Sequence, residues 1–201
     1  EAEALTEEAA SAVEGVIGVP TGLRTLDHVL RGLRRRHLVI AAGRPGGGKT
    51  ALGGCIAAHA ACRAGIPTAF FSLEMSRAEI AQRMRSLLSG VSGSRLDRGF
   101  LSDDDRRALD QANAMLRSAP MRITDRPGMT AFEIAAAARR YRSALGGLGL
   151  IVVDYVQKMG VRSRANSTRE QDVSELSRGL KALAQELEVP VLALAQLNRD
   201  V

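Results

Sequence analysis

The sequence predicts an α/β fold in which a mostly parallel, twisted sheet is flanked by helices. Two observations lead to this class. Short apolar stretches alternate along the chain with stretches that have the apolar spacing and capping residues of helices. The stretch "GLGLIVVDY" is apolar up to its aspartate, which is typical of a strand buried on both faces of a parallel sheet. Strands that alternate with helices form parallel sheets through crossover connections.

The first residues are expected to lie outside this fold. Residues 1–15, "EAEALTEEAASAVEG", have good helix propensity and end at Gly15. They carry five glutamates and no basic residue, a charge of −5, so the remainder of this +6 chain carries +11. We therefore divide the chain into a linker helix or tail at 1–16 and a folded domain at 17–201.

Five stretches are expected to be strands. Each is short, is rich in apolar or β-branched residues, and is followed by a glycine, a turn or a charged residue. The expected strands cover residues 37–43, 67–74, 121–125, 147–155 and 189–197.

Five further stretches are expected to be helices. Two of them begin with a capping box, formed by Ser76 with Glu79 and by Thr130 with Glu133. Another has three aspartates in its first turn, where negative charge complements the helix dipole. The expected helices cover residues 50–65, 76–90, 102–118, 130–144 and 169–187.

Composition restricts the class of protein. The chain has no run of about 18 apolar residues and no basic, apolar leader, so we expect neither a membrane span nor a signal peptide. Cys55 and Cys62 lie too far apart on one helix to form a disulfide, which favours a reducing, cytoplasmic location. The basic excess is compatible with a nucleic-acid partner, although a general preference for Arg (25 residues) over Lys (3) explains it equally well.

The glycine-rich loop after the first expected strand predicts a phosphate site. "GRPGGGKT" fits the pattern G-x-x-x-x-G-K-[ST] and lies between an expected strand and an expected helix. Such a loop points backbone N–H groups at phosphates, which requires positive φ angles and no Cβ in the way. The helix N-terminus adds its positive dipole end. The expected nucleotide-binding residues are Gly43, Arg44, Pro45, Gly46, Gly47, Gly48, Lys49, Thr50 and Ala51.

Three polar residues follow other strands at the edge where doubly wound sheets bind ligands. Asp154 ends "LIVVD" and is a candidate Walker B aspartate, or else it caps the following turn. Glu74 follows the second strand and is a candidate for activating water, or else it is an exposed turn carboxylate. Gln196 ends the last strand, where either γ-phosphate sensing or ordinary capping explains it.

Together these motifs resemble the C-terminal ATPase domain of DnaB-type replicative helicases, a hexameric RecA-like family. The resemblance runs from about Ile17 to the end of the chain and includes "GVPTGLRTLDHVLRGL", "GRPGGGKTAL", "FSLEMS", "DYVQKM" and "LSRGLKALAQELEVPVLALAQLNR". Many RecA-like ATPases share the first two loosely, whereas "SLEMS", "DYVQ" and "QLNR" together are far more specific. The resemblance implies a RecA-like P-loop NTPase core.

The resemblance also implies a role for each candidate residue. Lys49 and Thr50 would hold the phosphates of ATP and a Mg²⁺ ion, and Asp154 would support the metal. Glu74 would position the attacking water, and Gln196 would couple the γ-phosphate to DNA contacts. The implied activity is ATP hydrolysis coupled to translocation on single-stranded DNA and duplex unwinding.

The implied partners are single-stranded DNA, further copies of this chain in a homo-hexameric ring, a primase and a helicase loader. The loop "GVRSRANSTRE" matches one that faces the central channel in the family and would contact single-stranded DNA there, or else it is a solvated surface loop. The residues assigned to DNA binding are Arg162, Arg164, Arg169 and Arg199.

The chain departs from the family pattern in two respects. Lys158 occupies a position that is usually apolar, and the chain ends before the family's second DNA loop and its arginine-finger segment. We therefore expect a C-terminally incomplete domain with poor activity of its own. Two alternatives remain: another RecA-like repair or recombination ATPase of the RadA type, and a loader-like or scaffold-like protein that binds nucleotide without turnover.

Overall fold

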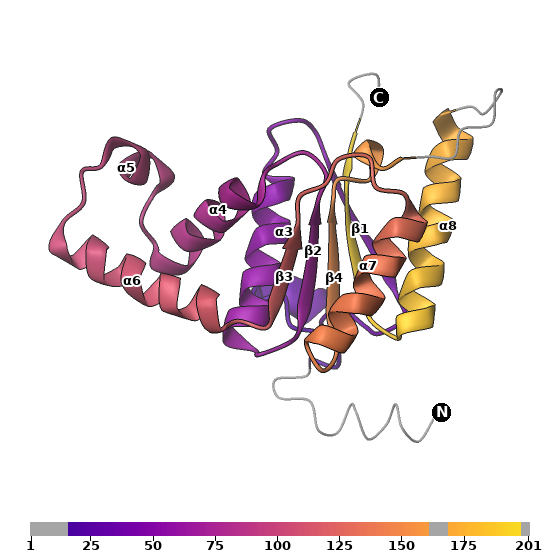
Figure 1. Cartoon of the computed structure of the whole chain (residues 1–201), viewed down its shortest axis with the longest axis horizontal. Helices are drawn as coiled ribbons and strands as arrows, with labels where there is room; N and C mark the ends of the chain where they lie inside the picture. The colour runs from indigo at the N-terminus through magenta and orange to yellow at the C-terminus, as the bar shows by residue number, and fades with distance from the viewer. Residues whose placement is uncertain (1–15, 161–168, 198–201) are drawn as a thin grey trace.

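The computed structural model describes residues 16–160 and 169–197, with the side chains in these ranges except those of 169, 170 and 172. Its centre is a five-stranded sheet in the order β1-β5-β4-β2-β3, and all neighbouring strands run parallel. This arrangement confirms the predicted fold class (Figure 1). The strands are β1 Leu38–Gly43, β2 Thr68–Ser72, β3 Met121–Thr124, β4 Leu150–Asp154 and β5 Val191–Gln196.

Helices cover both faces of the sheet (Figure 1). On one face, α3 (Lys49–Ala58) continues directly into a π-helical turn, η2 (His59–Arg63), and α4 (Arg77–Ser89) packs beside α3. On the other face lie α7 (Ala131–Ala144) and α8 (Arg169–Leu187). The helix expected at 50–65 is thus α3 followed by η2.

Alternating residues of the central strands build two separate cores, one on each face. Phe70 and Phe71 of β2 are both fully buried. Phe70 belongs to the core that includes Ile56 and Met84, whereas Phe71 belongs to the core that includes Ile134 and Leu180. Burying a side chain of this size stabilises the fold by roughly 1.5–3 kcal/mol. The central strands are therefore fixed from both sides.

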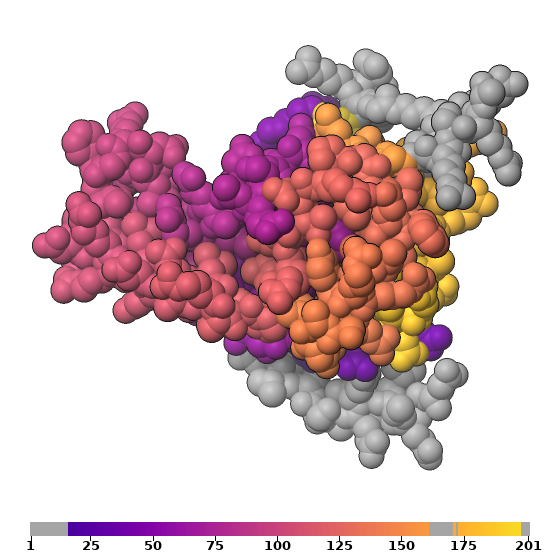
Figure 2. Space-filling model, viewed as in Figure 1, coloured from indigo at the N-terminus to yellow at the C-terminus, as the bar shows by residue number. Residues whose placement is uncertain are grey.

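A helical lobe projects away from the sheet, as Figure 2 shows at the left of the molecule. It consists of α5 (Gly93–Arg98) and α6 (Asp103–Ser118), and α6 packs against α4, which itself lies in the core beside α3. The expected capping box of α4 is present, because the Ser76 side chain accepts from the Glu79 N–H and the Glu79 carboxylate accepts from the Ser76 N–H. Ser102 and Asp105 form an equivalent box at the start of α6.

Three short elements were not predicted: α2 (Arg24–Leu30), α5 and the 3₁₀ turn η3 (Val156–Lys158). Neither α2 nor α5 contains a buried residue or a side-chain cap. The segment before α2 is instead held by Asp27, whose Oδ1 accepts from the Thr21 N–H at 2.8 Å and the Thr21 hydroxyl at 2.9 Å. Within 16–160 and 169–197, none of the helices combines the length and apolar character that a membrane crossing requires.

Candidate functional site

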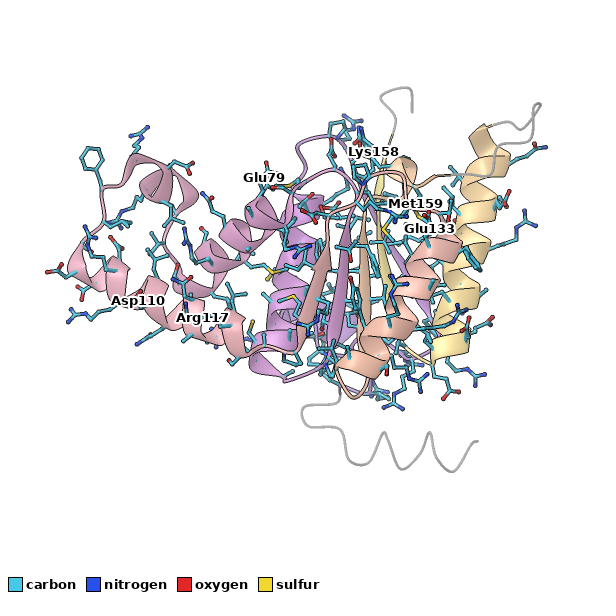
Figure 3. All side chains as sticks on the ribbon, viewed as in Figure 1. Glu79, Asp110, Arg117, Glu133, Lys158 and Met159 are labelled. Carbon is cyan, nitrogen blue, oxygen red and sulfur yellow. The ribbon has the colours of Figure 1, made fainter. Side chains whose placement is uncertain are left out.

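Four neighbouring strands end at the same edge of the sheet and carry the residues of the candidate site. β1 leads into the glycine loop, β5 ends at Gln196, β4 ends at Asp154, and the chain after β2 carries Glu74. The strand register pairs Gly43 with Gln196 and Ser72 with Asp154. Figure 3 shows the residues that follow β4, labelled at Lys158, at the upper end of the molecule toward which the strands run.

The backbone of the glycine loop explains its composition. Gly46 and Gly48 have φ angles of 74° and 79°, which other residues adopt only with strain. A Cβ on Gly47 would lie 3.0 Å from the Arg44 carbonyl oxygen. Gly48 is also the N-cap of α3 and offers no side-chain partner to the first N–H groups of that helix. The helix therefore presents N–H donors and its positive dipole end at this edge, which suits an anion.

Lys49 is the first residue of α3 and folds back over the loop. Its Nζ donates a hydrogen bond to the Arg44 carbonyl oxygen at 2.8 Å. A Cβ on Gly43 would lie 3.3 Å from Lys49 Cγ, so the small residue at 43 leaves room for the lysine stem. The ammonium group is thus held against the glycine loop at the N-terminus of α3.

Asp154 is the buried charge of the site. The residue is 2% exposed, and Oδ1 has no hydrogen-bond partner among the residues that the structure describes. Burial raises the pKa of Asp154, a side-chain hydrogen bond with Thr50 lowers it, and the negative charge of Glu74 raises it again; the net shift is upward. A buried carboxylate with a free oxygen is costly to ionise unless a cation approaches it.

Glu74 is exposed and lies just after β2, in a turn held by side-chain and backbone hydrogen bonds. The Ser72 hydroxyl donates to the Met75 carbonyl at 2.6 Å, and the Leu73 N–H donates to the Asp154 carbonyl at 2.7 Å. The structure therefore brings Glu74 close enough to Asp154 for its negative charge to raise the pKa of Asp154, after the larger effect of burial. One carboxylate is buried beside Thr50 and the other faces solvent, so the two suit different tasks.

Sequence reasoning missed Arg83. Burial is the main cause of the raised pKa of Asp154, and the positive charge of this α4 residue opposes it as the smallest contribution. Arg83 also helps to lower the pKa of Glu79, after the larger effect of the hydrogen bonds from Ser76. Together with Ala51, which follows the glycine loop, it lines an open cavity of about 480 Å³. The i,i+4 spacing of Glu79 and Arg83 is visible in the sequence, but the proximity of Arg83 to Asp154 depends on how α4 packs on the sheet.

The residues assigned to DNA binding cannot be placed with the others. Arg162, Arg164 and Arg199 lie outside the described residues, and Arg169 begins α8 with its side chain undescribed. Lys158, the departure from the family pattern, is exposed, and its Nζ lies 5.9 Å from the centre of the Tyr155 ring. A lysine is therefore accommodated there without disturbing the core.

The residues present fit a nucleotide with Mg²⁺. Magnesium is usually bound through one or two protein oxygens together with substrate phosphates, rather than by an all-protein cage. Thr50 and the buried Asp154 supply such oxygens beside a glycine loop whose inner side carries no Cβ atoms at Gly46 or Gly48. In the described part of the chain, no group of three or more His, Cys, Asp and Glu side chains is placed to hold a metal.

Residues 18–201 match the family model described as the DnaB-like helicase C terminal domain. The replicative DNA helicase DnaB of Leifsonia xyli subsp. xyli is 43% identical over 182 residues, which cover 90% of this chain and 39% of that protein. The replicative DNA helicase DnaB of Geobacillus stearothermophilus is 41% identical over 186 residues, covering 92% of this chain and 41% of that protein. The chain thus spans about two fifths of the length of these relatives.

A solved structure gives the same grouping. A DnaB-like replicative helicase, studied with its interactions with primase, superposes on this chain with a TM-score of 0.87 at 30% identity. The match covers 98% of this chain and 48% of that one. The likeness therefore extends over the whole described fold, from the segment before α2 to the end of β5.

Proposed function

The chain belongs to the family of DnaB-like helicase C-terminal domains, and from this premise we propose that it is the ATPase motor of a replicative DNA helicase. The motor couples ATP hydrolysis to translocation on single-stranded DNA and to unwinding of the duplex. The names of the relatives support this proposal. The observation that carries it is the buried carboxylate of Asp154, which keeps Oδ1 without a hydrogen-bond partner at the edge of the sheet where β1 leads into the glycine loop.

Each residue of the site has a proposed role in binding or turnover. The loop N–H groups and Lys49 hold the phosphates of ATP, and Thr50 and Asp154 hold Mg²⁺, which neutralises charge on the β- and γ-phosphates when bound. Glu74 accepts a hydrogen bond from the attacking water and orients it, since its carboxylate is exposed next to the metal-binding pair. Gln196 contacts the γ-phosphate from the end of β5, beside Gly43.

The proposed DNA contacts come from Arg162, Arg164, Arg169 and Arg199. A few arginines on one chain neutralise only a few phosphates, so firm binding requires a ring that repeats them and weakens steeply with salt. We therefore propose a homo-hexameric assembly, with primase and a helicase loader as further partners. One structural relative was studied with primase, which supports the first of these. Such a motor acts on the chromosome, so we propose a cytoplasmic location.

The alternatives lose support. A RadA-type ATPase is not favoured, because the relatives are replicative helicases. The second alternative is a protein that binds nucleotide without turnover. The presence in one site of Glu74, Lys49, Thr50 and Asp154 argues against it.

The discriminating experiment uses the natural protein that carries these residues, with a forked DNA duplex and a four-way junction as substrates. The proposal predicts ATP-dependent unwinding of the fork, lost in Lys49→Ala and retained in Lys158→Ala. Branch migration of the junction without unwinding of the fork would instead support the RadA-type function. Tight ATP binding with neither activity would support the role without turnover.

A further inference from the structure

Gln157 makes a two-way hydrogen-bonded pair with the backbone of Gln196. Its side-chain Nε2 donates to the Gln196 carbonyl oxygen at 2.9 Å, and the Gln196 N–H donates to Gln157 Oε1 at 3.0 Å. The two residues are 39 positions apart, and the pair is partly buried. A side-chain amide has the same donor and acceptor as a peptide group, so Gln157 pairs with β5 as a neighbouring strand would.

The pair occurs where the sheet lacks a strand. β4 pairs with β5 only as far as Val153 opposite Ala193, since the chain turns away after Asp154 and forms η3. β5 continues to Gln196, which on its other side remains in register with Gly43 of β1. Without Gln157, the N–H and C=O of Gln196 would lose their protein partners, which is unfavourable for partly buried backbone groups.

This contact joins two parts of the candidate site. Gln157 lies three residues after Asp154, and Gln196 lies beside the start of the glycine loop. One side chain therefore fixes the distance between the segment after β4 and the end of β5. On the other side, the Leu197 N–H donates to the Gly43 carbonyl at 3.0 Å, so the end of β5 is held from both edges.

We propose that Gln157 is a positioning residue that holds Gln196 where its side chain can contact a γ-phosphate. This inference rests on the proposed function, because it assumes that the site binds ATP and that Gln196 distinguishes ATP from ADP. In this proposal Gln157 contacts only the Gln196 backbone and neither nucleotide nor metal. Its effect reaches the ligand only through the Gln196 backbone, and this indirect action makes it separable from the phosphate-binding residues.

The test measures the affinity of the 201-residue chain for Mg·ADP and for a Mg complex of a non-hydrolysable ATP analogue. Wild type is compared with Gln157→Ala, Gln196→Ala, Lys49→Ala and the matched neighbour Lys158→Ala. We expect Gln157→Ala to bind ADP within about twofold of wild type and to lose the preference for the triphosphate as Gln196→Ala does. Lys158→Ala keeps that preference, and Lys49→Ala weakens both nucleotides.

The pH dependence of nucleotide preference in Gln157→Glu is a measurement that a purely structural role of Gln157 would not change. The ionised carboxylate of this variant can accept from the Gln196 N–H but cannot donate to its carbonyl, whereas the protonated acid can do both. The triphosphate preference of this variant, divided by that of wild type at the same pH, is therefore expected to rise as the pH is lowered from about 7 to about 4.5, toward the ordinary Glu pKa of about 4.3. Amide hydrogen exchange at Gln196 is expected to be about tenfold faster in Gln157→Ala, the size of one hydrogen bond.

The outcomes separate the two proposals. If wild type binds neither nucleotide, or Lys49→Ala binds as well as wild type, the proposed function fails and the positioning role fails with it. If wild type binds and Gln157→Ala keeps the full triphosphate preference, only the positioning role is overturned. The positioning role alone is also overturned if Gln157→Ala loses the triphosphate preference while Gln196→Ala keeps it. Equal binding of both nucleotides by wild type would overturn it as well.

Discussion

Gly53 of α3 packs directly against Leu194 of β5. A Cβ on Gly53 would lie 2.8 Å from Leu194 Cδ1 and 3.4 Å from a methyl carbon of Val152. Leu194 is itself fully buried and cannot move aside at low cost. The absent side chain therefore lets α3 approach the sheet, and the position of α3 sets the position of the glycine loop at its N-terminus.

This packing predicts opposite results for two adjacent substitutions. Gly53→Ala forces the helix or Leu194 to shift, so we expect a loss of about 1–3 kcal/mol in unfolding free energy and weaker nucleotide binding. Gly54→Ala meets only Leu87 Cδ1 at 3.9 Å and removes a helix-destabilising glycine, so we expect no loss and a gain of up to about 1 kcal/mol. Urea denaturation of both variants decides the matter, and equal stabilities would contradict this account of α3.

Asp154→Asn is expected to stabilise the chain in the absence of nucleotide and Mg²⁺. Burial raises the pKa of Asp154, so ionising this group costs folding free energy. The cost is absent below the unfolded pKa of 3.8, grows as the pH rises through the raised folded pKa, and is fully present above it. Near neutral pH we expect a gain on the order of 1 kcal/mol, or about 2–4 °C in Tm.

Thermal melting of Asp154→Asn at about pH 4 and about pH 7 tests this sign, with the exposed α6 residue Asp110 changed to Asn as the control. The gain should be larger at the higher pH for Asp154→Asn alone. The variant should also lose the effect of Mg²⁺ on nucleotide affinity. A destabilised Asp154→Asn at neutral pH would show that the carboxylate is satisfied by the protein itself.

The capping boxes predict the opposite pH dependence. Hydrogen bonds from Thr130 lower the pKa of Glu133, and those from Ser102 lower the pKa of Asp105. A lowered folded pKa gives stability that is present above the unfolded values near 4 and is lost as the pH falls through the folded pKa. We expect Thr130→Ala to cost about 1 kcal/mol at about pH 7 and less at about pH 3. Ser143→Ala, an exposed change on the same helix, should cost little at either pH.

Several elements could be predicted because their signals are local. The boxes at Ser76 and Thr130 fix two helix starts within a few residues, and the unbroken apolar stretch before Asp154 identifies the central strand. The short helices α2 and α5 have neither a fully buried residue nor a side-chain cap. α2 packs on the core only through the partly buried Leu26 and Leu30, a pattern too short to identify a helix.

Some residues of the candidate site could likewise be predicted from local sequence, and others could not. The glycine loop is specified by adjacent residues, so its spacing alone predicts it. Gln157 stands in a quoted motif, but its partner lies 39 positions away, and only the order of the strands brings the two together. Arg83 likewise affects Asp154 through the packing of α4, which no local pattern encodes.

Glu74→Gln is expected to separate binding from turnover. The amide keeps the shape of the side chain but cannot accept a proton from water or orient it as a carboxylate does, so ATP hydrolysis by the assembled protein should fall by about 10²–10⁴. Nucleotide affinity should stay within about twofold, since no phosphate contact is removed. Glu188→Gln, which changes an exposed carboxylate paired with Arg36, is the control. Normal turnover in Glu74→Gln would assign the water-orienting role to another residue.

The most direct test of the central claim is isothermal titration calorimetry of the 201-residue chain with Mg·ADP, comparing wild type, Lys49→Ala and Lys158→Ala. Both variants remove one lysine charge from the same edge of the sheet, but only Lys49 belongs to the glycine loop. The account predicts that Lys158→Ala binds like wild type, whereas Lys49→Ala binds roughly 10- to 150-fold more weakly, the value of a hydrogen bond to a charged group. Equal affinities of Lys49→Ala and wild type would contradict a phosphate site in this loop.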